Sequence, residues 1–326
     1  MGDVVNYRAP RGPLVAPGQI EHHDADMTAT FAADVTLDEA QHKLLESRQW
    51  LPIDGEASRE LGSLVDSNST GPLRLGYGAW RDLLLGCQFL NGEGELITVG
   101  ARTMKNVAGY DLTKFMVGSH GIFGRLVTLT TRTYRKPDAA LVANFDPDLR
   151  TLSALLLTSA RPQWSLLARD SLLCGYLGDA RTIDFYETEL PRHRPRIVER
   201  QSVEGDVALR ARLWRAAHGN GLFAFRAAVA PSKVRAFVDA AQLTRWVADA
   251  AFGAILGSVE VALQSALLIA AEEAGASIVL LDDYGHPVNP SPDPAVQALL
   301  ERLKNSFDPN HRLRPLPVPA SASGDR

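Results

Sequence analysis

The chain has 326 residues, of which 45% are hydrophobic and 22% charged, the profile of a soluble globular protein with room for about two domains. The formal net charge of −4 argues against a nucleic-acid-binding surface, which is normally basic. No run of about 18 apolar residues predicts a transmembrane helix, and the N-terminus shows no signal-peptide or myristoylation pattern. We therefore expect a cytoplasmic protein that reaches a membrane surface only through partners.

Two segments open the chain before its glycine-rich region. Residues 1–19 are rich in Pro and Gly and predict an irregular arm. Residues 27–32 predict a strand. Thr36 and Glu39 then have the spacing of a capping box, which predicts a helix that runs to about Arg48.

The region from residue 61 to 109 is dense in glycine and short apolar runs. An Asn-Gly-Glu-Gly turn at 91–94 predicts a hairpin. The elements expected here and just beyond are strands at 83–90 and 96–99, a short helix at 111–117 and a β-branched strand at 126–134. Lys136-Pro-Asp closes this half of the chain.

The second half is built differently, with Ala/Leu-rich helical stretches between short apolar strands. The expected helices span 149–159, 203–218, 232–242, 262–274 and 294–307. The Pro/Ala/Ser-rich tail predicts disorder. The expected divisions are an arm at 1–19, a first domain at 20–137, an α+β C-terminal domain at 138–314 and a disordered tail at 315–326.

Cysteine and histidine offer little chemistry. Cys87 and Cys174 lie in apolar runs without a CxxC partner, which predicts buried free thiols, a reducing compartment and no zinc site. His22 and His23 precede two aspartates, and a solvated polar turn explains them better than a metal. His120 fits a partly exposed loop side chain. No pattern of a Ser-His-Asp or metal-dependent hydrolase is present, so the catalytic residues stay unknown.

The glycines between residues 71 and 130 are the most informative feature. Glycine-rich turns expose backbone N–H groups that can form anion-binding nests for a pyrophosphate. Hairpin turns explain the same glycines equally well. The spacing alone leaves both interpretations open.

Three motifs in this region carry a resemblance. They are Arg81-Asp-Leu-Leu-Leu-Gly86, Met104-Lys-Asn-Val-Ala-Gly-Tyr-Asp-Leu112 and Met116-Val-Gly-Ser-His-Gly-Ile-Phe-Gly124. Together they resemble the FAD-binding subunit of glycolate oxidase, a family of PCMH-type flavoproteins related to vanillyl-alcohol oxidase and to D-lactate and glycolate dehydrogenases. The resemblance covers about residues 20–137, and Phe307-Asp-Pro-Asn is similar to the family's C-terminal Asp-Pro motif. It implies an α+β fold: a PCMH-type FAD-binding domain, mainly its second subdomain, followed by an α+β C-terminal domain.

The resemblance also implies a site and an activity. Family members oxidise 2-hydroxy acids by hydride transfer to FAD. The implied partners are a catalytic flavoprotein subunit and an iron–sulfur subunit, with a small 2-hydroxy acid as substrate. The cofactor would lie in a glycine-lined channel, and its expected binding residues are Gly62, Ser67, Asn68, Gly71, Gly76, Gly78, Arg81, Asn106, Gly109, Tyr110, Gly118, Ser119, Gly121, Gly124 and Val127.

Some residues at these motifs have an ordinary structural explanation too. Arg81 and Lys105 are more often ion-pair partners than catalytic groups. Trp80 and Tyr110 fit either stacking on a flavin or ordinary core packing. Protein side chains filling the glycine-lined channel would argue against a flavin there.

The chain also departs from the family pattern. Only about two dozen residues precede Asp26, so the family's first subdomain with its glycine-rich loop is expected to be lacking. Ser63 replaces a glycine, Asp66 brings a negative charge towards the expected pyrophosphate, and Ile122 replaces a threonine. These departures support an alternative, a non-catalytic structural or assembly subunit with a degenerate flavin site. A true start further upstream is a third possibility.

Overall fold

The computed structural model describes residues 13–100, 112–216, 223–281 and 293–317. The chain forms two compact units. The first unit comprises Met1–Ser69, Ala79–Lys136 and Ser291–Leu316. The second unit comprises Thr70–Gly78, Pro137–Pro290 and Pro317–Arg326. Each unit contains both helices and strands, which confirms the expected α+β class.

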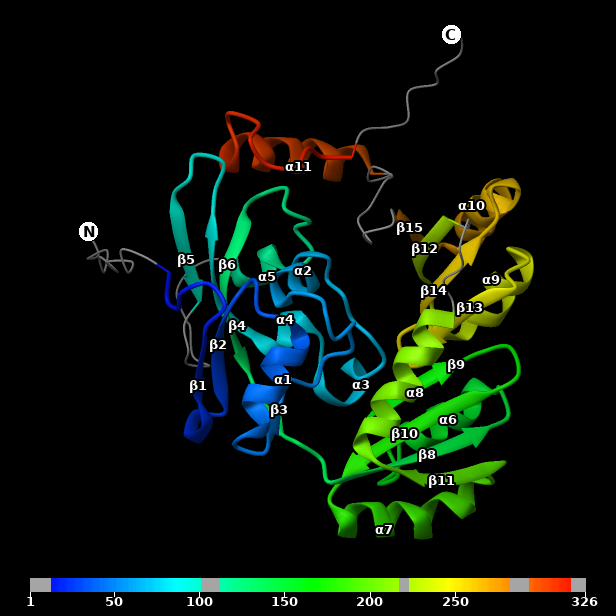
Figure 1. The fold of residues 1–326 in the computed structure, drawn as a ribbon. Coiled ribbons are helices and arrows are strands. Elements are labelled where there is room, and N and C mark those ends of the chain that lie inside the picture. The colour runs from blue at the N-terminus through cyan, green and yellow to red at the C-terminus, as the bar shows by residue number, and fades with distance from the viewer. Residues whose placement is uncertain (1–12, 101–111, 217–222, 282–292, 318–326) are drawn as a thin grey trace, which may run out of the picture. The chain divides into compact units, whose positions relative to one another are not determined.

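The first unit is built on a five-stranded antiparallel sheet (Figure 1). Its strands, in spatial order, are β1 (Ile20–His23), β2 (Thr28–Ala32), β6 (Arg125–Arg132), β4 (Leu84–Leu90) and β5 (Leu96–Gly100). β3 (Gln49–Trp50) and β7 (Tyr134–Arg135) form a separate ribbon. The four strands expected at 27–32, 83–90, 96–99 and 126–134 are therefore confirmed, with β7 continuing the last of them.

Helices and one 3-10 turn complete the first unit. They are η1 (Asp24–Asp26), α1 (Leu37–Leu45), α2 (Leu61–Asp66), α4 (Trp80–Leu83), α5 (Leu112–Met116) and α11 (Pro294–Phe307). At α1 the Thr36 side chain accepts from the Glu39 N–H and the Glu39 carboxylate accepts from the Thr36 N–H, so the predicted capping box is confirmed. The core behind these helices contains Phe31, Leu44, Leu61, Trp80, Phe89 and Leu129.

The last helix, α11, belongs to the first unit, although it lies near the C-terminal end of the chain. It has the bounds expected from the sequence and groups with residues 291–316 of that unit. Its Phe307 ring stacks on Phe115, with centroids 5.6 Å apart, and lies 6.2 Å from the rings of Phe89 and Phe123. Burial of these aromatic surfaces holds the chain's end on the first unit.

The second unit contains an eight-stranded antiparallel sheet. Its strands, in spatial order, are β11 (Ile197–Gln201), β8 (Ala139–Phe145), β10 (Leu172–Gly178), β9 (Trp164–Leu167), β13 (Arg245–Asp249), β14 (Ala254–Val259), β12 (Phe223–Ala228) and β15 (Ser277–Leu281).

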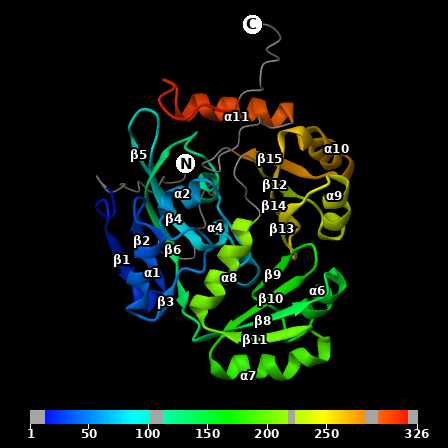
Figure 2. The same ribbon diagram turned by 45° about the vertical axis from the view of Figure 1, so that its right-hand side comes forward.

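Helices of the second unit pack on this sheet, among them α7 (Ala180–Glu189) and α8 (Val203–Ala216). In Figure 2, α7 lies by β8 and β10, and α9 (Val234–Ala240) lies beside α10 (Gln264–Ala274) at the other end. The remaining helices and 3-10 turns are α3 (Arg74–Tyr77), α6 (Leu149–Leu156), η2 (Leu190–His193), η3 (Pro231–Lys233) and η4 (Val261–Leu263). α7 was not predicted from the sequence, although Ile183 and Tyr186 have helical spacing and Asp179 accepts from the Thr182 N–H as an N-cap.

A buried carboxylate in the second unit, that of Asp206, pairs with an aromatic side chain and with a buried arginine. Trp164 is fully buried and its indole lies against Gly175. A Cβ at position 175 would overlap the indole, so only glycine leaves room for the ring. The Trp164 Nε1–H donates to Asp206 Oδ1 at 2.8 Å, and Arg210 Nε donates to Asp206 Oδ2 at 2.9 Å. This arrangement pairs both oxygens of a buried carboxylate.

The two cysteines are buried free thiols, as expected. Burial raises the pKa of the Cys174 thiol well above its ordinary range, which keeps that thiol protonated and unreactive. In the part of the chain that the structure describes, no helix is long and apolar enough to cross a membrane.

Candidate functional site

The expected cofactor residues fall into three groups. Those in the first unit are Gly62, Ser67, Asn68, Arg81, Gly118, Ser119, Gly121, Gly124 and Val127. Those in the second unit are Gly71, Gly76 and Gly78. Asn106, Gly109 and Tyr110, together with Lys105, lie outside the described residues.

The centre of the first group is the turn that follows α5, residues Gly118 to Gly121, which we call the 118–121 turn. It lies against the C-terminal end of α2. The Gly118 N–H donates to Val65 O at 3.0 Å, and Gly118 packs on Asn68, whose Cβ would lie 3.2 Å from a Cβ at position 118. The structure thus brings together Asn68, Gly118, Ser119 and Gly121.

Asp66 fixes this turn with its carboxylate and its backbone carbonyl. Its Oδ1 accepts from Ser119 Oγ at 2.7 Å and from the Gly121 N–H at 2.8 Å. Its backbone O accepts from the His120 N–H at 2.9 Å. Three consecutive residues of the turn therefore donate to one aspartate. From the sequence, Asp66 was expected to face a phosphate. Its contact with Ser119 was not predicted, because it joins residues more than 50 positions apart.

The backbone around this contact adopts unusual conformations. Gly118 and Gly121 have φ values of 79° and 71°, and the non-glycine residues His120 and Asn68 have φ values of 53° and 46°. Left-handed conformations at non-glycine residues are uncommon and persist where the surroundings impose them. The contacts of Asp66 supply that constraint at the turn.

Asn68 carries a polar atom of the kind that a bound group could pair. Its Oδ1 is buried and has no hydrogen-bond partner among the described residues. The indole Nε1 of Trp80, a side chain that is fully buried, has none there either. Buried polar atoms are nearly always paired, so each of these two fits a partner outside the described protein atoms.

Ser63 and Ser67 are engaged within α2. Arg59 Nη2 donates to Ser63 Oγ at 2.8 Å and to Ser67 Oγ at 3.2 Å. Partial burial lowers the pKa of the Arg59 guanidinium, which stays cationic because its ordinary pKa is so high. Ser63 replaces a glycine of the family pattern, and its hydroxyl takes part in this local network. Arg59 was not predicted as part of the site, because it lies before α2 and reaches the serines from the segment that leads into the helix.

Two glycines of the expected channel serve protein packing. A Cβ at Gly62 would lie 2.8 Å from Ala33 Cβ and from Ala33 O, and the Gly62 N–H donates to that same oxygen. A Cβ at Gly124 would overlap the Phe89 ring. Both bare faces meet the protein's own atoms, so packing alone accounts for glycine at these positions. Val127 accepts from the Ala33 N–H through its backbone oxygen.

Lys304, in the last helix, α11, holds Ile122, the residue that follows the 118–121 turn. Its Nζ donates to Ile122 O at 2.9 Å, to Asp308 Oδ2 at 2.6 Å and to Arg314 O at 2.8 Å. Burial by itself raises the pKa of Asp308, but hydrogen bonds from Lys304 and from the Leu313 and Arg312 N–H groups outweigh it and bring the pKa to about 2. The Phe307-Asp308 motif is thus a structural anchor for the segment at Ile122.

The group in the second unit is held by that unit's own residues. Arg74 Nε donates to the buried Asp249 at 2.7 Å, and its guanidinium lies 4.2 Å from the centroid of the Phe252 ring. Burial raises the pKa of Asp249 to about 6, against the opposing charge of Arg74. Gly76 approaches Gln163 so closely that a Cβ would lie 2.9 Å from its Cα.

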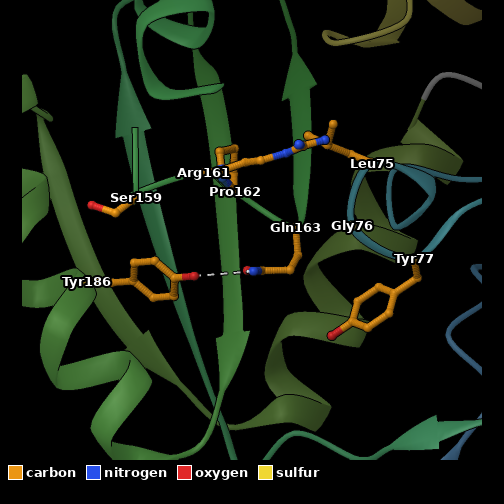
Figure 3. Close-up of a pocket in the computed structure, with 8 residues that line it drawn as sticks. All are labelled: Leu75, Gly76, Tyr77, Ser159, Arg161, Pro162, Gln163 and Tyr186. Carbon is orange, nitrogen blue, oxygen red and sulfur yellow. Dashed lines mark hydrogen bonds between the residues drawn. The ribbon is translucent and has the colours of Figure 1, made fainter. Parts of the chain in front are cut away.

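Gly76 also lines a hollow of about 450 Å³ in the second unit. In Figure 3 the Gln163 amide points toward Tyr186, whose hydroxyl accepts from its Nε2 at 3.4 Å. The other lining residues are Leu75, Tyr77, Ser159, Arg161 and Pro162. The hollow is partly polar and open, and Gly76 contributes backbone to it.

The remaining candidates have ordinary surroundings. Arg81 is exposed. His22 Nε2 lies 3.1 Å from Gln49 Oε1, and His23 lies 3.1 Å from Glu21. Among the described residues no group of three or more His, Cys, Asp or Glu side chains is placed to hold a metal ion.

The residues around Asn68 therefore fit a flavin, whereas the donors held by Asp66 do not. Asn68 and the adjoining backbone of Gly118 offer a buried acceptor beside a residue without a side chain. The donors of Ser119 and Gly121 are occupied by a carboxylate, which repels the phosphates of a dinucleotide.

Comparison with known proteins supplies the wider context. Residues 16–100 match the family model of the FAD binding domain. The chain is 32% identical over 128 residues to glycolate oxidase subunit GlcE of Escherichia coli (strain K12), covering 38% of this chain and 36% of that protein. It is 31% identical over 152 residues to glycolate oxidase subunit GlcD of Bacillus subtilis (strain 168), covering 44% and 32%. The matched part thus spans about a third of these relatives' length.

A solved structure of alkyldihydroxyacetonephosphate synthase has the same fold. The TM-score is 0.64 at 14% identity, over 90% of this chain and 65% of that one. At this identity the similarity concerns the fold alone. The domain match and the glycolate oxidase relatives show that residues 16–100 are similar to FAD binding domains, and that part of the chain is similar to subunits of glycolate oxidase.

Proposed function

We propose that this chain is the FAD-binding subunit of a glycolate oxidase-like complex that oxidises a 2-hydroxy acid. The observation that carries the proposal is the 32% identity to glycolate oxidase subunit GlcE over 128 residues. The similarity to GlcD, another glycolate oxidase subunit, adds support for the same substrate class. The proposed partners are a catalytic flavoprotein subunit and an iron–sulfur subunit.

The proposed site uses residues of the first unit. When bound, FAD would supply the hydride acceptor. Asn68 would pair its buried Oδ1 with the cofactor, and Gly118, whose bare face meets the Asn68 side chain, would support Asn68 in that position. Asp66 and Lys304 act by holding the 118–121 turn and the following Ile122 in one conformation. The remaining expected positions, including Gly71, Gly78 and Arg81, stay proposals of the same kind.

Purification of the full chain, alone and with its partner subunits, tests the proposal. The expected result is a yellow complex that releases FAD on denaturation and is bleached by a 2-hydroxy acid in the absence of oxygen. Asn68→Ala should lower the FAD content of the purified complex, while Asn144→Ala, in β8 of the second unit, should leave it unchanged. A colourless complex that takes up no added FAD would contradict the proposal.

A specific observation favours a second candidate, a structural or assembly subunit with a degenerate flavin site. The two polar residues among the departures from the family pattern, Ser63 and Asp66, both form hydrogen bonds within the protein. Their polar groups are therefore stable without a cofactor. A double variant, Ser63→Gly with Asp66→Ala, separates the candidates. FAD uptake by the double variant alone would favour the structural subunit, and equal uptake by the wild type would favour the flavoprotein.

A further inference from the structure

Asp66 lies where three successive donors of the 118–121 turn converge. Ser119 Oγ and the Gly121 N–H donate to its Oδ1 at 2.7 and 2.8 Å, and the His120 N–H donates to its backbone O at 2.9 Å. Hydrogen bonds to an ionised carboxylate are shorter and about twice as strong as neutral ones. Three hydrogen bonds thus join the turn to the aspartate.

The backbone conformation of the turn explains why it takes an anion. His120 and Gly121 have positive φ values, and their N–H groups donate to the backbone O and to the Oδ1 of Asp66, whereas the N–H groups of Gly118 and Ser119 donate to Val65 O and Met116 O. Adjacent N–H groups presented in such a turn can bind an anionic group, commonly phosphate. In this chain the anion is the carboxylate of Asp66, and Ser119 is buried beneath it with 2% of its surface exposed.

We propose that Asp66 is an internal anion that closes the 118–121 turn to the phosphates of a cofactor, so that the charge at position 66 sets the affinity for FAD. The inference rests on the proposed function in one respect, that FAD is the ligand. It adds that this turn contributes no phosphate contact in the wild type. FAD is held by the Asn68 side of the site, and the carboxylate opposes its phosphates.

Asp66→Asn is the informative variant because the amide keeps an oxygen acceptor for Ser119 and Gly121 while the charge is removed. Glu46→Gln is its matched control, since it makes the same change of net charge in the first unit at an exposed side chain that pairs with Lys43. FAD and riboflavin are the two probes. They share the isoalloxazine ring, but riboflavin carries no phosphate.

The affinities of the full-length proteins are measured by flavin fluorescence titration. Asp66→Asn should bind FAD tighter than the wild type by on the order of tenfold or more, since a unit charge near a phosphate is removed. Riboflavin affinity should not change, and Glu46→Gln should match the wild type with both probes. Unchanged or weaker FAD binding by Asp66→Asn overturns the inference while leaving the proposed function in place.

Amide hydrogen exchange at Gly121 separates a failure of the inference from a failure of the proposed function. If Asp66 holds the turn, exchange is slow in the wild type and in Asp66→Asn and faster in Asp66→Ala. Equal exchange rates in all three proteins overturn the assignment of Asp66 as the turn's ligand. Absence of FAD binding in every protein, with that exchange pattern intact, refutes the proposed function and the effect on FAD affinity together.

Discussion

The Nζ of Lys304 lies 2.6 Å from Oδ2 of Asp308, and both side chains are almost fully buried. Lys304 donates its other two ammonium hydrogens to the backbone oxygens of Ile122 and Arg314. Asp308 also accepts from the N–H groups of Arg312 and Leu313. The pair is therefore fully hydrogen-bonded, which is the condition under which a buried ion pair is tolerated.

Lys304→Met should destabilise the protein strongly because it leaves the Asp308 carboxylate buried without its cation. Loss of one partner of a buried pair costs about 3–5 kcal/mol. The measurement is the free energy of unfolding from urea denaturation. Arg302→Met is the control, since this exposed residue on the same helix should change stability by no more than about 0.5 kcal/mol. Equal effects of the two substitutions would contradict a stabilising role for the pair.

The same pair predicts a dependence of stability on pH. The pKa of Asp308 is about 2 in the folded protein, below its ordinary value of about 3.9 in an unfolded chain. A lowered folded pKa contributes stability that is complete above pH of about 4 and is lost as the pH falls towards 2. Thermal unfolding of the wild type and of Asp308→Asn should therefore differ most above pH 4 and converge below it. A gap that widens on acidification would refute this assignment.

Gly175→Ala should be severely destabilising because the added methyl group would overlap the indole of Trp164. Overpacking of a rigid core costs about 1–3 kcal/mol and sometimes more. Gly205→Ala is the matched control in the same unit. A Cβ there would meet only Ser202 Oγ and Gln201 at 3.4 Å or beyond, so the change should stabilise by about 0.4–1 kcal/mol. Chemical denaturation of both variants measures the difference, and a harmless Gly175→Ala would show that Trp164 packs elsewhere.

Arg210→Met should destabilise the second unit in a pH-dependent way. Burial raises the pKa of Asp206 to about 7, against the hydrogen bond from Trp164, and the variant removes the guanidinium that pairs with the ionised carboxylate. A carboxyl whose folded pKa is raised above its unfolded value lowers stability as the pH rises from about 4 through the folded pKa. The variant should thus be closer to the wild type at pH 5 than at pH 8 in its free energy of unfolding. Arg212→Met, at an exposed position of α8, should show no such pH dependence.

Local patterns in the sequence determined several elements correctly. The capping box at Thr36 and Glu39 and the helix at Pro294–Phe307 depend on residues within a few positions of one another. The strands around the Asn91 hairpin follow from short apolar runs and turn residues. The motif at 81–86 lies within residues 16–100, which match the FAD binding domain, so this part of the resemblance followed from the sequence alone.

The tertiary structure alone decided what the candidate site residues contact. Asp66 meets Ser119 and Gly121 across 53 and 55 positions, and Lys304 reaches Ile122 across 182. No periodicity links positions so far apart. The Asp66 carboxylate, which the sequence placed against a phosphate, thereby became an acceptor for the Ser119 hydroxyl and the Gly121 N–H, because folding brings these two donors within hydrogen-bonding distance of it.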